Sequence, residues 1–159
     1  MVLATADLWD ANQKELTYLN LPLQNFGLKN SFAGEIVTLK VFEDNTWVRK
    51  ILSENGEGKV LVIDGGGSRR CALVGDKIAK LALDNNWAGL LVYGCIRDCA
   101  VIDSMLISLK AIGTCPVKSI KEDVGYRGLE LLIAGCTISE GNYLYADQDG
   151  VLISTKQLA

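Results

Sequence analysis

Two runs of apolar residues in the middle of the chain predict strands that are buried on both faces. Lys59–Asp64 is a nearly continuous apolar run that ends in an acid and is followed by three glycines. Gly89–Tyr93 is a second run of the same kind. Such runs are typical of parallel strands in a sheet that helices cover. The stretch from Asp76 to about Asn86 has apolar residues at helical spacing, so positions 59–93 predict a strand–helix–strand unit with parallel strands.

The rest of the chain shows shorter helical and strand patterns. Thr5–Lys14 predicts a helix with Thr5 as a candidate cap, and Asp44–Thr46 predicts the cap of a second helix that runs to about Ser53. Gly34–Phe42 has the alternation of a strand. The last third predicts four more strands, over residues 107–111, 129–134, 143–146 and 151–154. This order favours a layered α/β or β/β/α domain over a pure doubly wound sheet.

Length and composition indicate one globular domain over residues 1–159. Hydrophobic residues make up 49% of the chain and charged residues 22%, and we find no internal repeat and no linker. The longest apolar run without charge, Ala88–Ile96, is too short to cross a bilayer. Five irregularly spaced cysteines suit a reducing compartment better than a disulfide framework. We therefore expect a soluble cytoplasmic protein that does not enter a membrane.

Charge and the absence of histidine exclude several classes of function. Sixteen basic and 19 acidic residues give a net charge of −3, which argues against direct binding of nucleic acid, because such binding depends on a basic surface. The chain contains no histidine, which removes Ser-His-Asp and Cys-His catalysis and every histidine-ligated metal site. Any chemistry must use carboxylates, Arg, Lys, Tyr, Cys or a hard metal ion.

Two segments that follow the predicted parallel strands are candidates for a ligand site. Asp64–Ser68 and Gly94–Asp98 come at the carboxyl ends of these strands, where ligands bind in open α/β sheets, and we expect them to lie side by side around a cavity. The glycine run permits close backbone approach, but it has neither the Walker pattern nor the dinucleotide pattern. A plain turn and a ligand loop both remain open for it.

The start of the predicted Asp76 helix is a second candidate. Backbone N–H groups of Gly75, Asp76, Lys77 and Ile78 at a helix start form an anion site supported by the helix dipole, and Lys77 adds a positive charge. The alternative is that Asp76 only stabilises the start of its own helix. Lys77 as a Schiff-base residue is disfavoured, because a lysine without apolar shelter stays protonated.

Arg97 and Asp98 combine two functional groups in adjacent positions. They could form a self-paired surface dipeptide. Each could instead face its own partner, with Arg97 holding a carboxylate or oxyanion and Asp98 holding a hard divalent cation such as Mg²⁺. Asp76 lies 21 positions before Arg97, one crossover away, so it could share the same pocket.

These residues carry a resemblance to a known family. Asp76, twenty intervening residues and then Arg97–Asp98 resemble the D-x20-R-D signature of the regulator of ribonuclease activity A family, which includes class II 4-hydroxy-4-methyl-2-oxoglutarate aldolases. The resemblance extends over almost the whole chain, in blocks at Thr5–Leu8, Asn25–Gly27, Phe42–Asn45, Val62–Ser68, Ala72–Asp76, Val92–Asp98 and Tyr143–Asp147.

The resemblance implies a single-domain β/β/α swivelling fold with a mixed central sheet, assembled as a ring-shaped homotrimer with sites near subunit contacts. It implies that the Gly75–Ile78 segment and Arg97 bind substrate and that Asp98 anchors a divalent cation, Mg²⁺ or Mn²⁺. Aldolases of the family often carry a further acid at the third position after the R-D pair. Here that position is Val101, and the nearest acid is Asp103.

The implied activity is a metal-dependent lyase reaction on a small 2-oxo acid. The substrate would be 4-hydroxy-4-methyl-2-oxoglutarate, cleaved to two pyruvates, with decarboxylation of oxaloacetate as a side activity through the same pyruvate enolate. Arg97 would stabilise the enolate charge, and Asp76 would orient the water that moves the proton. The alternative is a non-catalytic inhibitor that binds ribonuclease E, although such regulators tend to lack the aspartate that Asp98 matches. A catalytically decayed relative is a third reading, with Val101 as its only hint.

Overall fold

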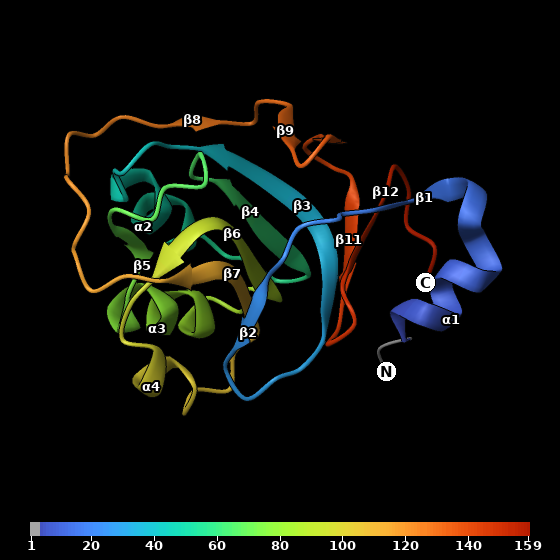
Figure 1. Cartoon of the computed structure of the whole chain (residues 1–159), viewed down its shortest axis with the longest axis horizontal. Helices are drawn as coiled ribbons and strands as arrows, with labels where there is room; N and C mark the ends of the chain where they lie inside the picture. The colour runs from blue at the N-terminus through green and yellow to red at the C-terminus, as the bar shows by residue number, and fades with distance from the viewer. Residues whose placement is uncertain (1–3) are drawn as a thin grey trace.

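The computed structural model describes residues 4–159, and its centre is a ten-stranded mixed sheet (Figure 1). The predicted domain over residues 1–159 is therefore described except for its first three residues. Eight strands follow one another in the order β1-β12-β11-β3-β4-β6-β7-β2, with β5 paired to β6 and β8 to β3. The bounds are β1 Leu16–Tyr18, β2 Gln24–Phe26, β3 Phe32–Lys40, β4 Lys59–Asp64, β5 Ala72–Val74, β6 Gly89–Ile96, β7 Leu109–Thr114, β8 Tyr126–Arg127, β11 Tyr143–Ala146 and β12 Val151–Ser154.

The middle of the sheet is parallel, as the apolar runs predict. β3, β4, β6 and β7 pair in parallel, and both flanks of the sheet are antiparallel. Leu61 and Ile63 of β4 belong to the hydrophobic cluster under the helices, whereas Val60 and Val62 pack with β11, β12 and a hairpin over residues 131–138. All four side chains are fully buried, because both faces of the strand are covered. The predicted fold class, an α/β domain with a mixed central sheet, is confirmed.

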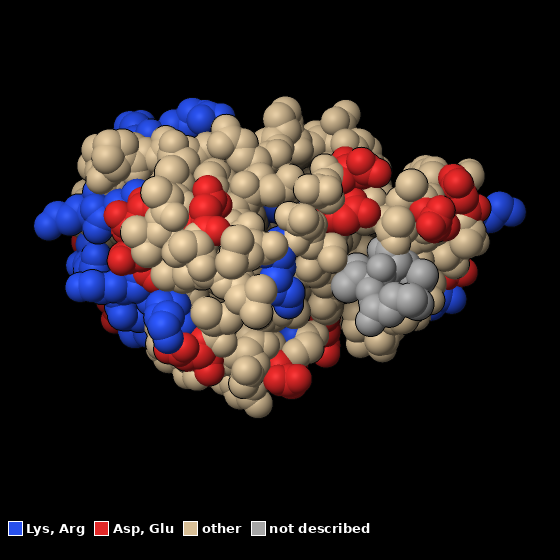
Figure 2. Space-filling view, turned by 90° about the horizontal axis from the view of Figure 1, so that it is seen from below, with Lys and Arg blue, Asp and Glu red and all other residues tan. Residues whose placement is uncertain are grey.

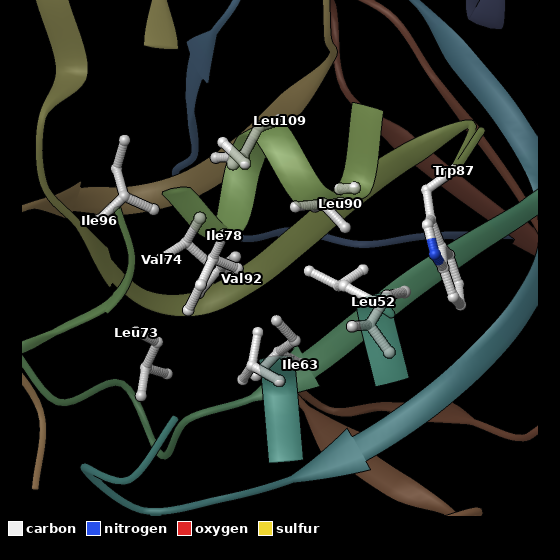
Figure 3. Packing of buried hydrophobic residues seen from close by; sticks show 14 of the residues in the cluster. Leu52, Ile63, Leu73, Val74, Ile78, Trp87, Leu90, Val92, Ile96 and Leu109 are labelled. Atoms are coloured by element: carbon white, nitrogen blue, oxygen red, sulfur yellow. The ribbon is translucent and has the colours of Figure 1, made fainter. Parts of the chain in front are cut away.

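Short helices cover one face of the sheet and a hairpin covers the other. The helices are α1 Thr5–Asn12, α2 Thr46–Leu52, α3 Asp76–Asp84 and α4 Cys99–Ile102, with a 3-10 turn at Gln13–Glu15. The hairpin consists of β9 Leu131–Ile133 and β10 Cys136–Ile138. Ile78 of α3, Leu52 of α2 and Leu90 and Val92 of β6 meet in the core between the helices and the sheet (Figure 3).

Several predicted boundaries shift. The helix predicted over Thr5–Lys14 ends at Asn12, and Thr5 is its first residue instead of its cap. The Thr5 hydroxyl donates to Asp147 Oδ1 at 2.7 Å, and its N–H donates to Asp147 Oδ2 at 2.8 Å, so the helix start is tied to the turn before β12. The strand predicted over Gly34–Phe42 begins and ends two residues earlier.

The cysteines are unpaired, as predicted. Cys71, Cys95, Cys115 and Cys136 are buried, and Cys99 is partly exposed. Burial raises the pKa of the Cys71 and Cys95 thiols, which keeps both in the neutral, unreactive form. Among the helices that the structure describes, none combines the length and the apolar character that a bilayer crossing requires.

Candidate active site

Two segments of the predicted site come into contact at the C-terminal end of β6. β5 is the parallel neighbour of β6 at this end, so the residues that follow both strands emerge at the same edge of the sheet (Figure 1). The Arg97 N–H donates to the Val74 carbonyl at 2.9 Å. The Asp76 N–H donates to Asp98 Oδ2 at 3.1 Å. The structure thus places Asp76 against the Arg97–Asp98 pair.

A cavity of about 140 Å³ lies at this junction. All six residues that the sequence assigned to the site line it, from Gly75, Asp76, Lys77 and Ile78 at the start of α3 to Arg97 and Asp98 after β6. Six further residues complete the lining, namely Asn45, Arg49, Ala72, Lys118, Ser119 and Lys121. The cavity is therefore built from four places in the sequence.

Asp98 occupies an unusual backbone conformation at the entrance to α4. Its φ of 58° and ψ of 36° lie in the left-handed region, which costs free energy for most residues and is tolerated best by Gly, Asn and Asp. Its carboxylate caps the start of α3 through the Asp76 N–H. A Cβ atom on Gly75 would lie 2.9 Å from Asp98 Oδ2, so the carboxylate needs a glycine at position 75. The left-handed backbone of Asp98 and the absence of a side chain at Gly75 together fix the Asp98 carboxylate at the cavity.

Arg97 is half-buried and lies next to Asp98 at the entrance to α4. Its Nη1 donates to the Pro116 carbonyl over a long 3.4 Å, and its Nε lies 3.6 Å from the position of a Cβ on Gly75. No ion pair joins Arg97 to any carboxylate of residues 4–159. The two side chains are thus not a self-paired dipeptide, and most guanidinium donors remain open for a ligand.

The N–H groups at the start of α3 are only partly free. The Asp76 N–H is taken by Asp98, and the Lys77 N–H donates to Asp76 Oδ1 at 2.9 Å. The Ile78 N–H lies in the first helical turn and has no acceptor inside the helix. Asp76 therefore stabilises the start of its own helix, which was the alternative to a ligand site, and it also lines the cavity. The Ile78 side chain is buried in the core.

Positive charge dominates the cavity although the chain as a whole is acidic. Five basic residues line it against two acidic ones, Asp76 and Asp98; the basic residues are Arg49, Lys77, Arg97, Lys118 and Lys121. None of the five forms a salt bridge within residues 4–159, whereas five other basic residues do. Figure 2 shows Lys and Arg side chains gathered at the end of the molecule that holds α2 and β5 in Figure 1. This excess of positive charge suits a small ligand with more than one negative group.

The expected pairing of the glycine turn with the R-D pair is wrong. β6 does not end at Tyr93 but continues to Ile96, and β5 lies beside this extension. The Gly65 and Gly67 N–H groups donate to the Tyr93 carbonyl at 3.0 and 3.1 Å, so the glycine turn packs against the middle of β6. Since β5 takes the position beside the end of β6, the glycine turn does not line the cavity. It is a plain turn.

No local sequence pattern marks the lining residues that come from the start of α2 and from the chain after β7. Asn45 is the N-cap residue of α2, within the predicted cap, but its side chain does not cap the helix, and its Nδ2 donates to the Leu73 carbonyl at 3.2 Å. Ser119 and its neighbours look like an ordinary polar loop. The acid nearest to Val101, Asp103, accepts the Gly27 N–H at 2.9 Å and does not line the cavity, so it does not replace the missing acid there.

Other hollows of the surface lack this convergence of charge. One of about 700 Å³ lies at the start of β3, and its charged side chains are Lys29 and Glu35. Another, of about 290 Å³, adjoins the cavity and shares Arg97 and Asp98 with it, together with Cys99 and Cys115. The small cavity thus holds the densest set of functional groups, and the adjoining hollow offers space for a substrate beside the same pair.

Known proteins resemble the chain over nearly its full length. A protein of Laribacter hongkongensis, provisionally named 4-hydroxy-4-methyl-2-oxoglutarate aldolase, is 52% identical over 97% of each chain. A Dechloromonas aromatica protein with the same provisional name is 49% identical over 99% of each chain.

Two solved structures have the same fold. One, described as the RNA-processing inhibitor RraA from Thermus thermophilis, has a TM-score of 0.96 at 40% identity and covers 100% of this chain and 96% of its own. The other is described as an S-adenosylmethionine: 2-dimethylmenaquinone methyltransferase from Geobacillus kaustophilus, with a TM-score of 0.96 at 49% identity over 98% and 97% of the two chains. The RraA-like family model, described as Aldolase/RraA, matches residues 5–153. This chain therefore belongs to the RraA-like family.

Proposed function

We propose that this protein is a divalent-metal-dependent lyase that cleaves 4-hydroxy-4-methyl-2-oxoglutarate into two pyruvates and also decarboxylates oxaloacetate. The observation that carries the proposal is the placement of Arg97 and Asp98 against Gly75 in a cavity lined by five basic residues. An open guanidinium and a fixed carboxylate in a basic cavity are the groups that cleavage of a 2-oxo dicarboxylate requires. The provisional names of the relatives at 52% and 49% identity support the same reaction class.

The donor set at the cavity fits a hard divalent cation. Among residues 4–159, no three His, Cys, Asp or Glu side chains gather into a cage for an ion. Mg²⁺ does not need such a cage, because it keeps several waters and binds through one or two carboxylates plus substrate oxygens. Asp98 would hold it, since this carboxylate is exposed to solvent. Its Oδ2 is fixed by the Asp76 N–H, and the absence of a side chain at Gly75 leaves room for it. When bound there, Mg²⁺ or Mn²⁺ supplies Lewis acidity at the keto oxygen.

Arg97 and Asp76 then act on the substrate itself. Cleavage breaks the C3–C4 bond of 4-hydroxy-4-methyl-2-oxoglutarate. The C4 hydroxyl loses its proton, C4 becomes the keto carbon of one pyruvate, and the electron pair of the broken bond passes to the other fragment as an enolate. This enolate takes a proton at C3 and becomes the second pyruvate. Arg97 donates N–H groups to the enolate oxygen, where charge develops. Asp76 has one carboxylate oxygen on the Lys77 N–H, and its other oxygen orients the water that moves the proton. Lys77 and the Ile78 N–H attract the substrate carboxylate.

A non-catalytic role in RNA processing is the second candidate. The solved structure described as an RNA-processing inhibitor is 40% identical to this chain, and the net charge of −3 suits contact with a basic segment of ribonuclease E. Asp98 favours the enzyme, because its conformation and its contacts place a carboxylate at the cavity. Mixing with ribonuclease E, followed by capture and an RNA-cleavage assay, tests this role. Absence of binding at micromolar concentration would discard it.

The methyltransferase description of one similar structure finds no support at this cavity. S-adenosylmethionine carries a positively charged sulfonium, which five basic residues would repel.

The experiment measures pyruvate release from 4-hydroxy-4-methyl-2-oxoglutarate and from oxaloacetate, with and without Mg²⁺ or Mn²⁺. EDTA should abolish release, and Arg97→Ala should lower it by about 100- to 1,000-fold, the usual loss for a donor to a developing oxyanion. Arg70→Ala is the control, because that arginine is exposed and pairs with Glu43 outside the cavity. Full turnover in a chelated sample would refute the metal mechanism. No pyruvate from either substrate would refute the lyase. Light scattering of the same samples tests the expected homotrimer.

A further inference from the structure

Two buried polar atoms without partners belong to residues that line the same cavity. Asn45 Oδ1 and Ser119 Oγ have no hydrogen-bond partner, and in the part of the chain that the structure describes they are the only buried side-chain nitrogen or oxygen atoms in this condition. Asn45 is 9% exposed and Ser119 is 4% exposed. Folded proteins rarely leave buried polar atoms unpaired, unless a ligand or a water completes them. Because both residues line the cavity, its ligand is the natural partner.

The chemistry of these atoms restricts what the ligand presents. Asn45 Nδ2 donates to the Leu73 carbonyl, which can only accept, so the amide cannot be turned over and Oδ1 stays an acceptor. The Ser119 hydroxyl can donate. A ligand that satisfies Ser119 therefore brings an acceptor, and in a basic cavity the natural acceptor is a carboxylate oxygen.

Ser119 lies between two lysines on a segment that is held from both sides. Lys118 forms a bridge to Ala72, and the Ala72 N–H donates to the Val117 carbonyl at 2.8 Å. The Ile120 N–H donates to the Glu43 carbonyl at 2.9 Å. The segment Lys118–Lys121 thus runs between β5 and the turn before α2, as the chain between β7 and β8 shows in Figure 1. These contacts fix Ser119 in place before any ligand binds.

The charge of the cavity exceeds what one carboxylate needs. In the proposed function, Arg97 and the start of α3 take the 2-oxo acid end of the substrate. Arg49, Lys118 and Lys121 remain, and none of them forms a salt bridge within residues 4–159; the two lysines flank Ser119 in the sequence. These exposed charges, beside the buried hydroxyl of Ser119, attract a second anion to this side of the cavity.

We infer that Ser119, with Lys118 and Lys121, binds the second carboxylate of a dicarboxylic 2-oxo acid. This inference rests on the proposed function for the placement of the 2-oxo acid end, and it adds the group that selects the substrate class. Ser119 donates its hydroxyl hydrogen to the carboxylate, and the two lysines supply the charge. The site then prefers substrates with two carboxylates over substrates with one.

Calorimetric binding of two matched ligands tests the inference without turnover. 2-Oxoglutarate and 2-oxopentanoate have the same number of carbons and differ in the second carboxylate, which is a methyl group in 2-oxopentanoate. With Mg²⁺ present, the wild-type protein should bind 2-oxoglutarate at least about tenfold more tightly, the effect of one hydrogen bond to a charged group. Ser119→Ala should remove about tenfold of the 2-oxoglutarate affinity and change the 2-oxopentanoate affinity less than about twofold.

The double variant Lys118→Ala/Lys121→Ala should lose the preference entirely, and Lys80→Ala is the matched control. Lys80 lies on α3 one turn after Lys77, pairs with Asp84 and does not line the cavity. Equal affinities of wild-type protein for both ligands, no measurable binding of either, or equal losses for both in Ser119→Ala would overturn the inference. A protein that shows the predicted preference but releases no pyruvate would refute the lyase and leave this subsite standing.

Discussion

Asp44 holds together two parts of the cavity wall, and its replacement should cost several kcal/mol of stability. The side chain is 4% exposed. Its Oδ1 accepts the Thr46 N–H at 2.9 Å and the Thr46 hydroxyl at 2.7 Å, which fixes the start of α2. Its Oδ2 accepts the N–H groups of Glu122 and Val124 at 2.8 and 3.1 Å, which fixes the chain just after Lys121. One carboxylate thus joins the element that carries Asn45 to the segment that carries Ser119.

The magnitude follows from these four hydrogen bonds. Asp44→Asn keeps one oxygen and one pair of contacts, and it turns an NH₂ group toward the donors of the other pair. Hydrogen bonds to a charged group contribute about 1.5–3 kcal/mol each. Losing two of them leaves N–H or O–H donors facing another donor, so we expect the free energy of unfolding to fall by about 3–5 kcal/mol. A domain with the usual 5–15 kcal/mol would be strongly destabilised.

The same loss should depend on pH in a definite direction. Burial, the largest single influence, raises the pKa of Asp44, but the hydrogen bonds from Thr46, Val124 and Glu122 together outweigh it and hold that pKa below its usual value. A depressed pKa in the folded state means that the stabilisation is complete above the unfolded pKa of about 3.9. It is lost as the pH falls through the folded pKa. The difference between wild type and Asp44→Asn should therefore shrink below about pH 4.

Urea denaturation at pH 7 and pH 3 measures both effects. Asp84→Asn is the control, because Asp84 is exposed and pairs only with Lys80, an interaction worth about 0.3–0.5 kcal/mol. A fall of less than about 1 kcal/mol for Asp44→Asn at pH 7 would refute the count of four productive hydrogen bonds. A difference of the same size at both pH values would refute the role of the charged carboxylate.

Two further changes separate the chemistry of the site from its fold. Asp98→Asn keeps a residue that tolerates a φ of 58° and an oxygen for the Asp76 N–H, so unfolding free energy should change by less than about 1 kcal/mol while Mg²⁺-dependent pyruvate release falls about 100-fold or more. Turnover above a tenth of the wild-type value would contradict the assigned cation ligand. Gly75→Ala meets no backbone strain, because a φ of −112° suits any residue, but its Cβ would lie 2.9 Å from Asp98 Oδ2 and must displace that carboxylate. Turnover should fall about tenfold or more at nearly unchanged stability in urea; unchanged turnover would show that the carboxylate can move without loss.

The sequence predicts the long buried elements of the fold because their patterns are local. β4 was predicted with its observed bounds, since an unbroken apolar run has few alternative structures. β2 and β8, by contrast, hold three and two residues and are mostly exposed, so no apolar pattern marks them. Gly94 looked like the end of a strand, yet it lies inside β6, where a Cβ atom would approach Leu73 to 3.1 Å. The glycine here marks a close contact and not a turn.

The site divides in the same way. Asp76 was expected to share a pocket with Arg97 because it lies one crossover before it in the sequence, and the backbone contacts of both residues agree. The strand that pairs with β6 at this edge is β5, a short strand in the connection between β4 and α3 for which the sequence predicts no strand. Asn45 and Ser119 could not be found, because they reach the cavity through long-range contacts of α2 and of the chain after β7. No spacing in the sequence encodes such a contact.

The net charge of the whole chain does not show the electrostatic field at the cavity. The value of −3 argues against a nucleic-acid surface, yet the cavity carries five basic residues that form no salt bridge within residues 4–159. The basic pair visible in the sequence, Arg69–Arg70, makes contacts within the protein. Arg70 pairs with Glu43, and Arg69 donates to the Ile112 carbonyl. Charge that folding leaves unpaired around a small cavity attracts a small anion, because low-dielectric walls concentrate its field. The ligand is therefore predicted by which arginines and lysines the fold leaves without partners, and not by how many the chain contains.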